Sequence, residues 1–171
     1  MTHHTLKNIC IFAALMAVPS LPAAKKPDVR IPIADNANIV VEYVELLRTT
    51  DMGGLYPAGA ETDRRTSIGR IFEEAFADGG YKVNIETVPN NSGKTGDLTI
   101  TIMMSSWELN RMGEYECRFS GTIANGDQKI DLGMFVGTYT TIVVSSSQST
   151  KAYDTAARKA VDKLLKHFFR A

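Results

Sequence analysis

The chain has 171 residues, 19 basic and 19 acidic side chains, and a formal net charge of zero at pH 7. Proteins that bind nucleic acids ordinarily present a basic face, but no basic run here exceeds two residues, as in Lys25-Lys26 and Arg64-Arg65. The composition therefore argues against a nucleic-acid partner. The length is sufficient for a hydrophobic core that holds without disulfides or metals.

The first 24 residues have the features of a secretory signal peptide. Lys7 provides a positive charge, residues 9–18 are apolar, and residues 19–24 offer small side chains for cleavage. The apolar run is shorter than the about 20 residues that a membrane-spanning helix needs. Acylated bacterial envelope proteins carry a cysteine at the end of such a run, whereas Cys10 lies near its start. We therefore expect an exported protein, periplasmic or secreted, with no transmembrane span in the mature chain. Association with the outer membrane is left open.

Histidine and cysteine are rare after residue 24. One histidine, His167, and one cysteine, Cys117, occur there. Metal centres, Cys-His nucleophiles and Ser-His-acid triads each need two or more such groups at one point. The sequence therefore predicts no metal, no cofactor and no catalytic residue. Cys117 lies on the apolar side of an alternating segment, where a free cysteine behaves as a small hydrophobic residue.

The expected mature chain begins with a segment that has no periodic pattern, and a segment with an ambiguous pattern follows it. Residues 25–38 contain two prolines and no sustained period, which predicts an extended lead-in. Residues 39–171 are expected to form a single α+β domain. Within it, residues 39–48 are ambiguous, because acidic residues three apart suit a helix while the Val and Tyr content favours a strand. We interpret this segment as a strand.

Residues 49–63 are rich in glycine and turn formers and predict a long surface loop. Loops of about 15 residues are uncommon in compact domains and often serve function. Leu55 and Tyr56 in this loop are therefore candidate binding residues.

The remaining segments have clear periodicity. Residues 66–77 place apolar side chains on one face of a helix that ends before two glycines. Alternating segments follow, with a hairpin signal at Asn125-Gly126, and residues 153–168 carry a broad apolar stripe typical of an amphipathic helix. We therefore expect an α+β fold: an antiparallel four- to five-stranded sheet with two amphipathic helices packed on one face.

Alternation also places three large side chains on the face opposite the main apolar set. Met103 and Trp107 occupy this position in residues 98–107, and Phe135 occupies it in the strand after the hairpin. Exposed patches of this kind often mark partner or ligand sites, so Met103, Trp107 and Phe135 are candidate binding residues. The alternative is that the N-terminal segment or the long loop covers them, and both interpretations stay open.

Taken together, these elements resemble the YajG-like lipoproteins, and more loosely the LptE-like and transporter-auxiliary lipoproteins, of the Gram-negative envelope. The resemblance covers about residues 64–168 and rests on the export signal, the helix ending in ADGGYKV at residues 77–83, the strand opening DLTI at residues 97–100, the hairpin and the closing Ala-rich helix. It implies a non-catalytic protein with no catalytic residue to assign. The anchoring cysteine of these families is missing at the expected place.

Acidic pairs are the remaining candidates for chemistry. Glu114 with Glu116, or Glu42 with Glu45, would suit acid–base catalysis only in different environments across a cleft. Alternation places Glu116 beside Arg118 on a sheet face with polar character, which favours a solvated surface.

We therefore predict a non-catalytic periplasmic or envelope-associated accessory or binding protein that engages an envelope protein, a membrane-associated assembly, a glycan or a lipid. One alternative is a small exported hydrolase that uses Asp and Glu as acid–base residues. Another is a secreted effector-type module. An enzyme should show a deep pocket with convergent polar groups, and an accessory protein should show an open apolar patch.

Overall fold

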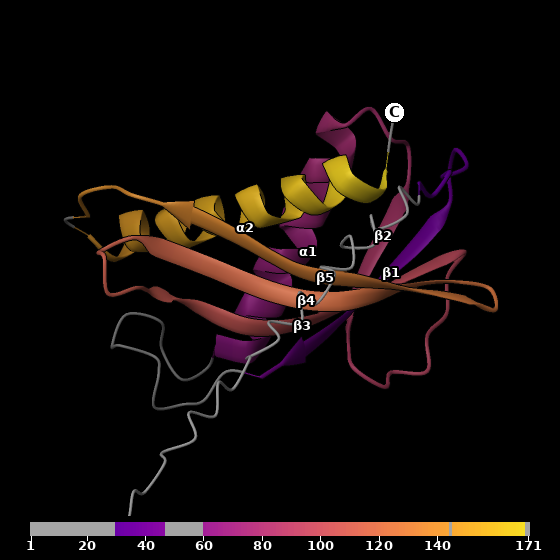
Figure 1. Cartoon of the computed structure of the whole chain (residues 1–171), viewed down its shortest axis with the longest axis horizontal. Coiled ribbons are helices and arrows are strands. Elements are labelled where there is room, and N and C mark those ends of the chain that lie inside the picture. Colours follow the sequence, from indigo (N-terminus) through magenta and orange to yellow (C-terminus); the bar gives the residue numbers. More distant parts are fainter. Residues whose placement is uncertain (1–29, 47–59, 144, 170–171) are drawn as a thin grey trace, which may run out of the picture.

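A computed structural model describes residues 30–46, 60–143 and 145–169. Five strands and two helices follow one another along these residues (Figure 1). In chain order they are β1 (Asn38–Glu45), α1 (Ala60–Asp78), β2 (Asn84–Pro89), β3 (Leu98–Leu109), β4 (Tyr115–Asn125), β5 (Gln128–Tyr139) and α2 (Ser146–Phe168). The strand expected within residues 39–48 is thus confirmed, and the expected signal peptide lies outside the described residues.

The five strands form one sheet with the order β2-β1-β3-β4-β5. β1 is parallel to both of its neighbours, while β3, β4 and β5 pair antiparallel. The α+β prediction is confirmed, but the expected all-antiparallel pairing is wrong. Its cause is the crossover through α1, which returns the chain to the same end of the sheet before β2 and so makes β1 and β2 parallel.

Both helices pack on one face of the sheet, as predicted, with α1 over β1 and β2 and α2 over β4 and β5 (Figure 1). α1 buries Ile68, Ile71, Phe72, Ala75 and Phe76 against the sheet. The helix begins at Ala60 rather than near residue 66, so the last part of the predicted loop is helical. Glu61 and Asp63 in its first turn suit the positive pole of the helix.

The predicted closing helix is confirmed as α2. Its N-cap is Ser145, whose side chain accepts a hydrogen bond from the backbone N–H of Gln148. The residues that it buries share one stripe and are mostly small or aliphatic: Ser149, Ala152, Tyr153, Ala156, Ala157, Ala160, Val161, Leu164, Leu165 and Phe168.

The β4–β5 hairpin is also confirmed, but its two central residues lie one position after the Asn125-Gly126 signal. Asn125 pairs with Gln128, so Gly126 and Asp127 are the central residues. Gly126 has a φ of 56° while Asn125 does not have a positive φ. Glycine at the first central position is typical of a type II′ turn.

Two β-bulges change which side chains face the helices. In β3 the pairing register shifts between Met104 and Ser106, and in β5 it shifts just before Gly133. A bulge inserts one extra residue into one strand, so side chains beyond it point to the opposite face from the one that strict alternation predicts.

Candidate functional site

The two aromatic candidates from the strands lie on the core side of the sheet. Trp107 is 2% exposed and pairs with Cys117 across β3 and β4. Phe135 packs against Phe119 and Phe168, with ring centroids 5.8 and 6.2 Å apart. The predicted placement of Trp107 and Phe135 on the outer face is therefore wrong, because each follows a bulge.

The third strand candidate is placed as predicted. Met103 is half-buried and pairs with Ser120 on the face away from the helices. The structure therefore does not bring the three strand candidates together. Leu55 and Tyr56 lie outside the described residues.

Each of the acidic residues considered for catalysis has a local partner. Glu42 accepts a hydrogen bond from Thr101, and Glu116 forms an ion pair with Arg118 at 2.8 Å. These contacts lie on the outer face of the sheet. Glu114 accepts a hydrogen bond from the side-chain amide of Asn110 in the β3–β4 turn.

Glu45 belongs to a more buried cluster at the end of β1. Arg64 of α1, 4% exposed, donates from Nε and from a terminal nitrogen to the two oxygens of Glu45. The hydroxyl of Tyr43 donates to the same carboxylate. Burial, followed by the negative charge of Glu45, raises the pKa of Tyr43. The bidentate contact between Arg64 and Glu45 fixes the start of α1 on β1. We therefore interpret the cluster as structural.

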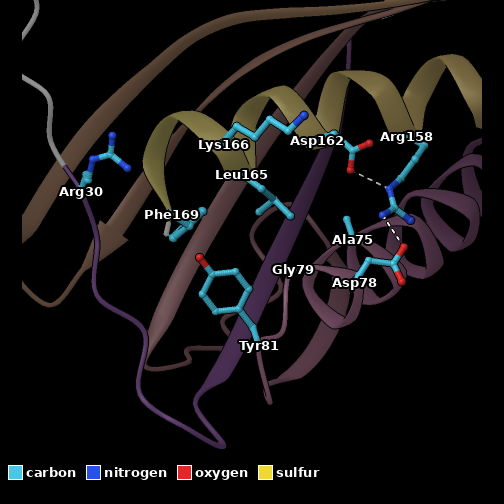
Figure 2. A pocket seen from close by; sticks show the side chains of 10 residues that line it. All are labelled: Arg30, Ala75, Asp78, Gly79, Tyr81, Arg158, Asp162, Leu165, Lys166 and Phe169. Carbon is cyan, nitrogen blue, oxygen red and sulfur yellow. Dashed lines mark hydrogen bonds and ion pairs between the residues drawn. The ribbon is translucent and has the colours of Figure 1, made fainter. Parts of the chain in front are cut away.

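A groove with a volume of about 500 Å³ lies between the C-terminal ends of α1 and α2. Figure 2 shows it from close by, with α2 on one side and the end of α1 on the other. We call it the inter-helix groove, and it is lined by Arg30, Ala75, Asp78, Gly79, Tyr81, Arg158, Asp162, Leu165, Lys166 and Phe169.

The turn that ends α1 builds one wall of this groove. Gly80 has a φ of 83°, its N–H donates to the carbonyl of Ala77, and the N–H of Tyr81 donates to the carbonyl of Phe76. These two bonds form a Schellman motif, which brings the residue after the turn back onto the last helical turn. The Tyr81 ring accordingly lies edge-on to Phe76, with centroids 5.5 Å apart. Phe169 contacts the same Phe76 ring at 5.5 Å from the side of α2.

An ion-pair network forms the opposite end of the groove. Arg158, in the middle of α2, donates to Asp162 one turn further along α2 and to Asp78 of α1, each at 2.8 Å, and so joins α2 to the end of α1 (Figure 2). Burial works to lower the pKa of Arg158, but hydrogen bonds to Asp162 and Asp78 outweigh it and raise that pKa. The guanidinium therefore stays charged between two carboxylates.

The groove thus combines an apolar wall with polar groups at its rim. Lys166 is exposed and Tyr81 is half-buried, and neither the Lys166 ammonium nor the Tyr81 hydroxyl has a hydrogen bond or ion pair among the described residues. Such a surface can hold an apolar group beside a polar one. Sequence reasoning missed it because its residues come from segments about 80 positions apart, such as Asp78 and Arg158. The Ala77-Asp78-Gly79-Gly80-Tyr81 segment was the available signal.

Cys117 and His167 occupy separate positions in the fold. Cys117 is fully buried, and this burial raises the pKa of its thiol, so the predicted core position is confirmed. His167 lies against Phe168 near the end of α2. No three His, Cys, Asp or Glu side chains within residues 30–46, 60–143 and 145–169 converge to hold a metal ion. In the same ranges, neither helix is long and apolar enough to cross a membrane.

No family model and no curated protein matches the chain. Solved structures do resemble it. A crystal structure described as an uncharacterized protein gives a TM-score of 0.53 at 8% identity, over 80% of this chain and 95% of that one. A PelC dodecamer from Paraburkholderia phytofirmans gives 0.50 at 14% identity, over 83% and 95%.

A third similar structure is XCC0632 from Xanthomonas campestris, of the DUF330 family, with a TM-score of 0.49 at 12% identity over 80% of this chain and 87% of that one. At these identities the likeness concerns the fold. None of the three structures is described as YajG-like or LptE-like, so that resemblance stays a prediction. The uncharacterized protein and the PelC dodecamer therefore show that the α+β arrangement of this chain recurs among solved structures.

Proposed function

We propose that this chain is a non-catalytic accessory or binding protein of the bacterial cell envelope, and that the inter-helix groove is its partner-binding surface. The partner is an envelope protein, a glycan or a lipid. The observation that carries the proposal is the groove itself, in which Tyr81, Leu165 and Phe169 provide an apolar wall and Lys166 offers a charged group at the rim. Binding sites commonly combine a mostly apolar lining with a few polar groups.

The export signal predicted from residues 1–24 supports a location in the cell envelope, and the resemblance to envelope lipoproteins agrees with this location. A periplasmic or secreted protein is the expected mature form. Attachment to the outer membrane is the alternative. The predicted signal peptide, however, has no lipid-anchoring cysteine at the usual place.

The hydrolase alternative receives less support from the acidic residues. A general acid and a general base need carboxyl groups in different environments. Asp78 and Asp162 at the groove instead share the guanidinium of Arg158. The candidate pairs on the sheet are likewise held by Thr101, Arg64 and Arg118.

The experiment expresses the full chain with its own N-terminus in a Gram-negative host and measures the intact mass of the protein from the periplasm. The proposal expects a mature chain that begins between Leu21 and Lys25. Protein that keeps Met1 and stays in the cytoplasm would contradict the envelope location.

Partner binding is then tested by crosslinking and affinity purification from the envelope fraction. The double variant Asp78→Ala/Lys166→Ala changes one acidic and one basic group at the groove, and Asp127→Ala/Lys129→Ala makes the matched change in the β4–β5 hairpin. We expect the first variant to lose the partner that the wild type and the second variant retain. Equal recovery with all three proteins would show that the groove is not the binding surface.

A further inference from the structure

A second cavity, of about 530 Å³, lies at the opposite end of α2 from the inter-helix groove. We call it the N-terminal cavity, because it borders the first turn of α2. Its apolar walls include Leu109 from the end of β3 and Tyr115 from the start of β4. Its other side carries hydroxyl groups from Thr141, Ser145, Ser146 and Ser149.

The first turn of α2 has an uncompensated positive pole. A helix leaves its first N–H groups without intrahelical partners, and its aligned peptide dipoles add a partial positive charge there. In α1, Glu61 and Asp63 in the first turn compensate this positive charge, whereas α2 has no acidic residue in its first turn. Ser145 accepts from the N–H of Gln148, but the N–H groups of Ser146 and Ser147 have no partner among the described residues.

Ser149 gives a second and independent indication of a ligand. It lines the cavity and is 2% exposed, yet its hydroxyl has no hydrogen-bond partner among the described residues. A buried hydroxyl without a hydrogen-bond partner is destabilising. A ligand that brings an acceptor oxygen to the cavity would satisfy this hydroxyl and the free N–H groups together.

We infer that the N-terminal cavity binds a small amphiphilic carboxylate, with the carboxylate at the first turn of α2 and the apolar body against Leu109 and Tyr115. Helix N-termini are favourable sites for anionic oxygens because N–H groups and the dipole act in the same direction. The residues that line the cavity include no lysine or arginine. A singly charged group therefore fits better than a doubly charged phosphate, whose second charge would be buried without a counter-ion.

The test measures binding of octanoate to the full-length protein by calorimetry and by shifts of backbone amide resonances. Octanamide matches its size without the charge, and acetate carries the charge without the apolar body. We expect octanoate to bind at least about tenfold more tightly than either probe, because charge and apolar contact act together. The shifted resonances should include Ser146, Ser147 and Ser149. Equal binding of octanamide, or shifts confined to other regions, would overturn the inference.

Two variants then test the residues. Ser146→Asp places a competing carboxylate at the helix start, where it also favours folding, and we expect it to weaken octanoate binding by at least about tenfold. Ser149→Ala removes the buried hydroxyl without adding charge, and a loss of several-fold is expected. The control Gln128→Asp adds the same charge at the β4–β5 hairpin and should leave binding unchanged. Unaltered affinity in a folded Ser146→Asp protein would contradict the proposed site.

Discussion

Gly137 of β5 lies directly beneath Ala156 of α2, so close that a Cβ atom on Gly137 would be 2.0 Å from the carbonyl oxygen of Ala156. The same atom would be 2.6 Å from the backbone nitrogen of Ala160. Only glycine permits this separation. The absence of a side chain on β5 and the alanine stripe of α2 together set the distance between the helix and the sheet.

The first prediction follows from this contact. Gly137→Ala should lower the free energy of unfolding by about 1–3 kcal/mol or more, because helix and strand must separate to admit the methyl group. Urea titration followed by circular dichroism measures the change. Ser120→Ala, on the outer face of β4, is the control and should shift the midpoint little. Unchanged stability of Gly137→Ala would mean that α2 does not pack this closely on β5.

A second prediction concerns Trp107, which the sequence suggested as a binding residue. Because it is 2% exposed, Trp107→Ala should destabilise the protein by about 3–5 kcal/mol, as truncation of buried aromatic residues does. Met112→Ala removes a side chain that is 85% exposed and should change stability by no more than about 0.5 kcal/mol. Chemical denaturation of both variants distinguishes a core residue from a surface one. A Trp107→Ala protein as stable as the wild type would indicate that the Trp107 side chain lies on the surface.

Alternation predicted most of the sheet correctly because each strand follows the period of two up to its bulge. Ile100, Ile102, Cys117 and Phe119 are all buried as expected. The period also explains the error at Trp107 and Phe135, because one inserted residue reverses every later side chain without changing the composition of the strand. No residue type marks the insertion in β3, whereas in β5 it lies beside Gly133, which has a φ of 70°, and a glycine inside a strand is a common signal of a bulge.

The position of β1 between β2 and β3 could not be predicted for a different reason. Pairing between β1 and β3 depends on contacts across 59 positions, such as Glu42 with Thr101, and local patterns carry no information about such partners. The inter-helix groove could not be predicted for the same reason. Cross-helix ion pairs, such as Arg158 with Asp78 and Asp154 with Arg70, join α2 to α1 across about 80 positions.

The third prediction concerns the free edge of β5. Lys159 and Lys163 of α2 donate to the carbonyl oxygens of Thr138 and Val136, at 3.0 and 2.7 Å. Edge strands with free carbonyls invite pairing with another chain, and charged side chains commonly prevent it. Replacing both lysines with methionine should therefore produce concentration-dependent association in sedimentation velocity.

The matched control for this edge is Lys129→Met/Lys151→Met, which removes two exposed lysines with no backbone contact among the described residues. It should sediment as the wild type does. If the Lys159→Met/Lys163→Met protein also behaves as the wild type, the lysines are not what keeps the β5 edge from pairing.

The last prediction is a pH dependence that isolates Cys117. Burial, followed by the charge of Glu116, raises the pKa of its thiol above the ordinary value of 9.0. The unfolded chain therefore loses this proton near pH 9 while the folded chain keeps it, so the contribution to stability is complete below pH 9 and is lost as pH rises further. Above pH 9 the free energy of unfolding of the wild type should fall more steeply than that of Cys117→Ala, by up to about 1.4 kcal/mol per pH unit. Tyr43 and the other ionisable groups are common to both proteins, so the difference between the two curves reports the thiol. Parallel curves between pH 8 and 10 would show that Cys117 can ionise in the folded state and is not sealed in the core.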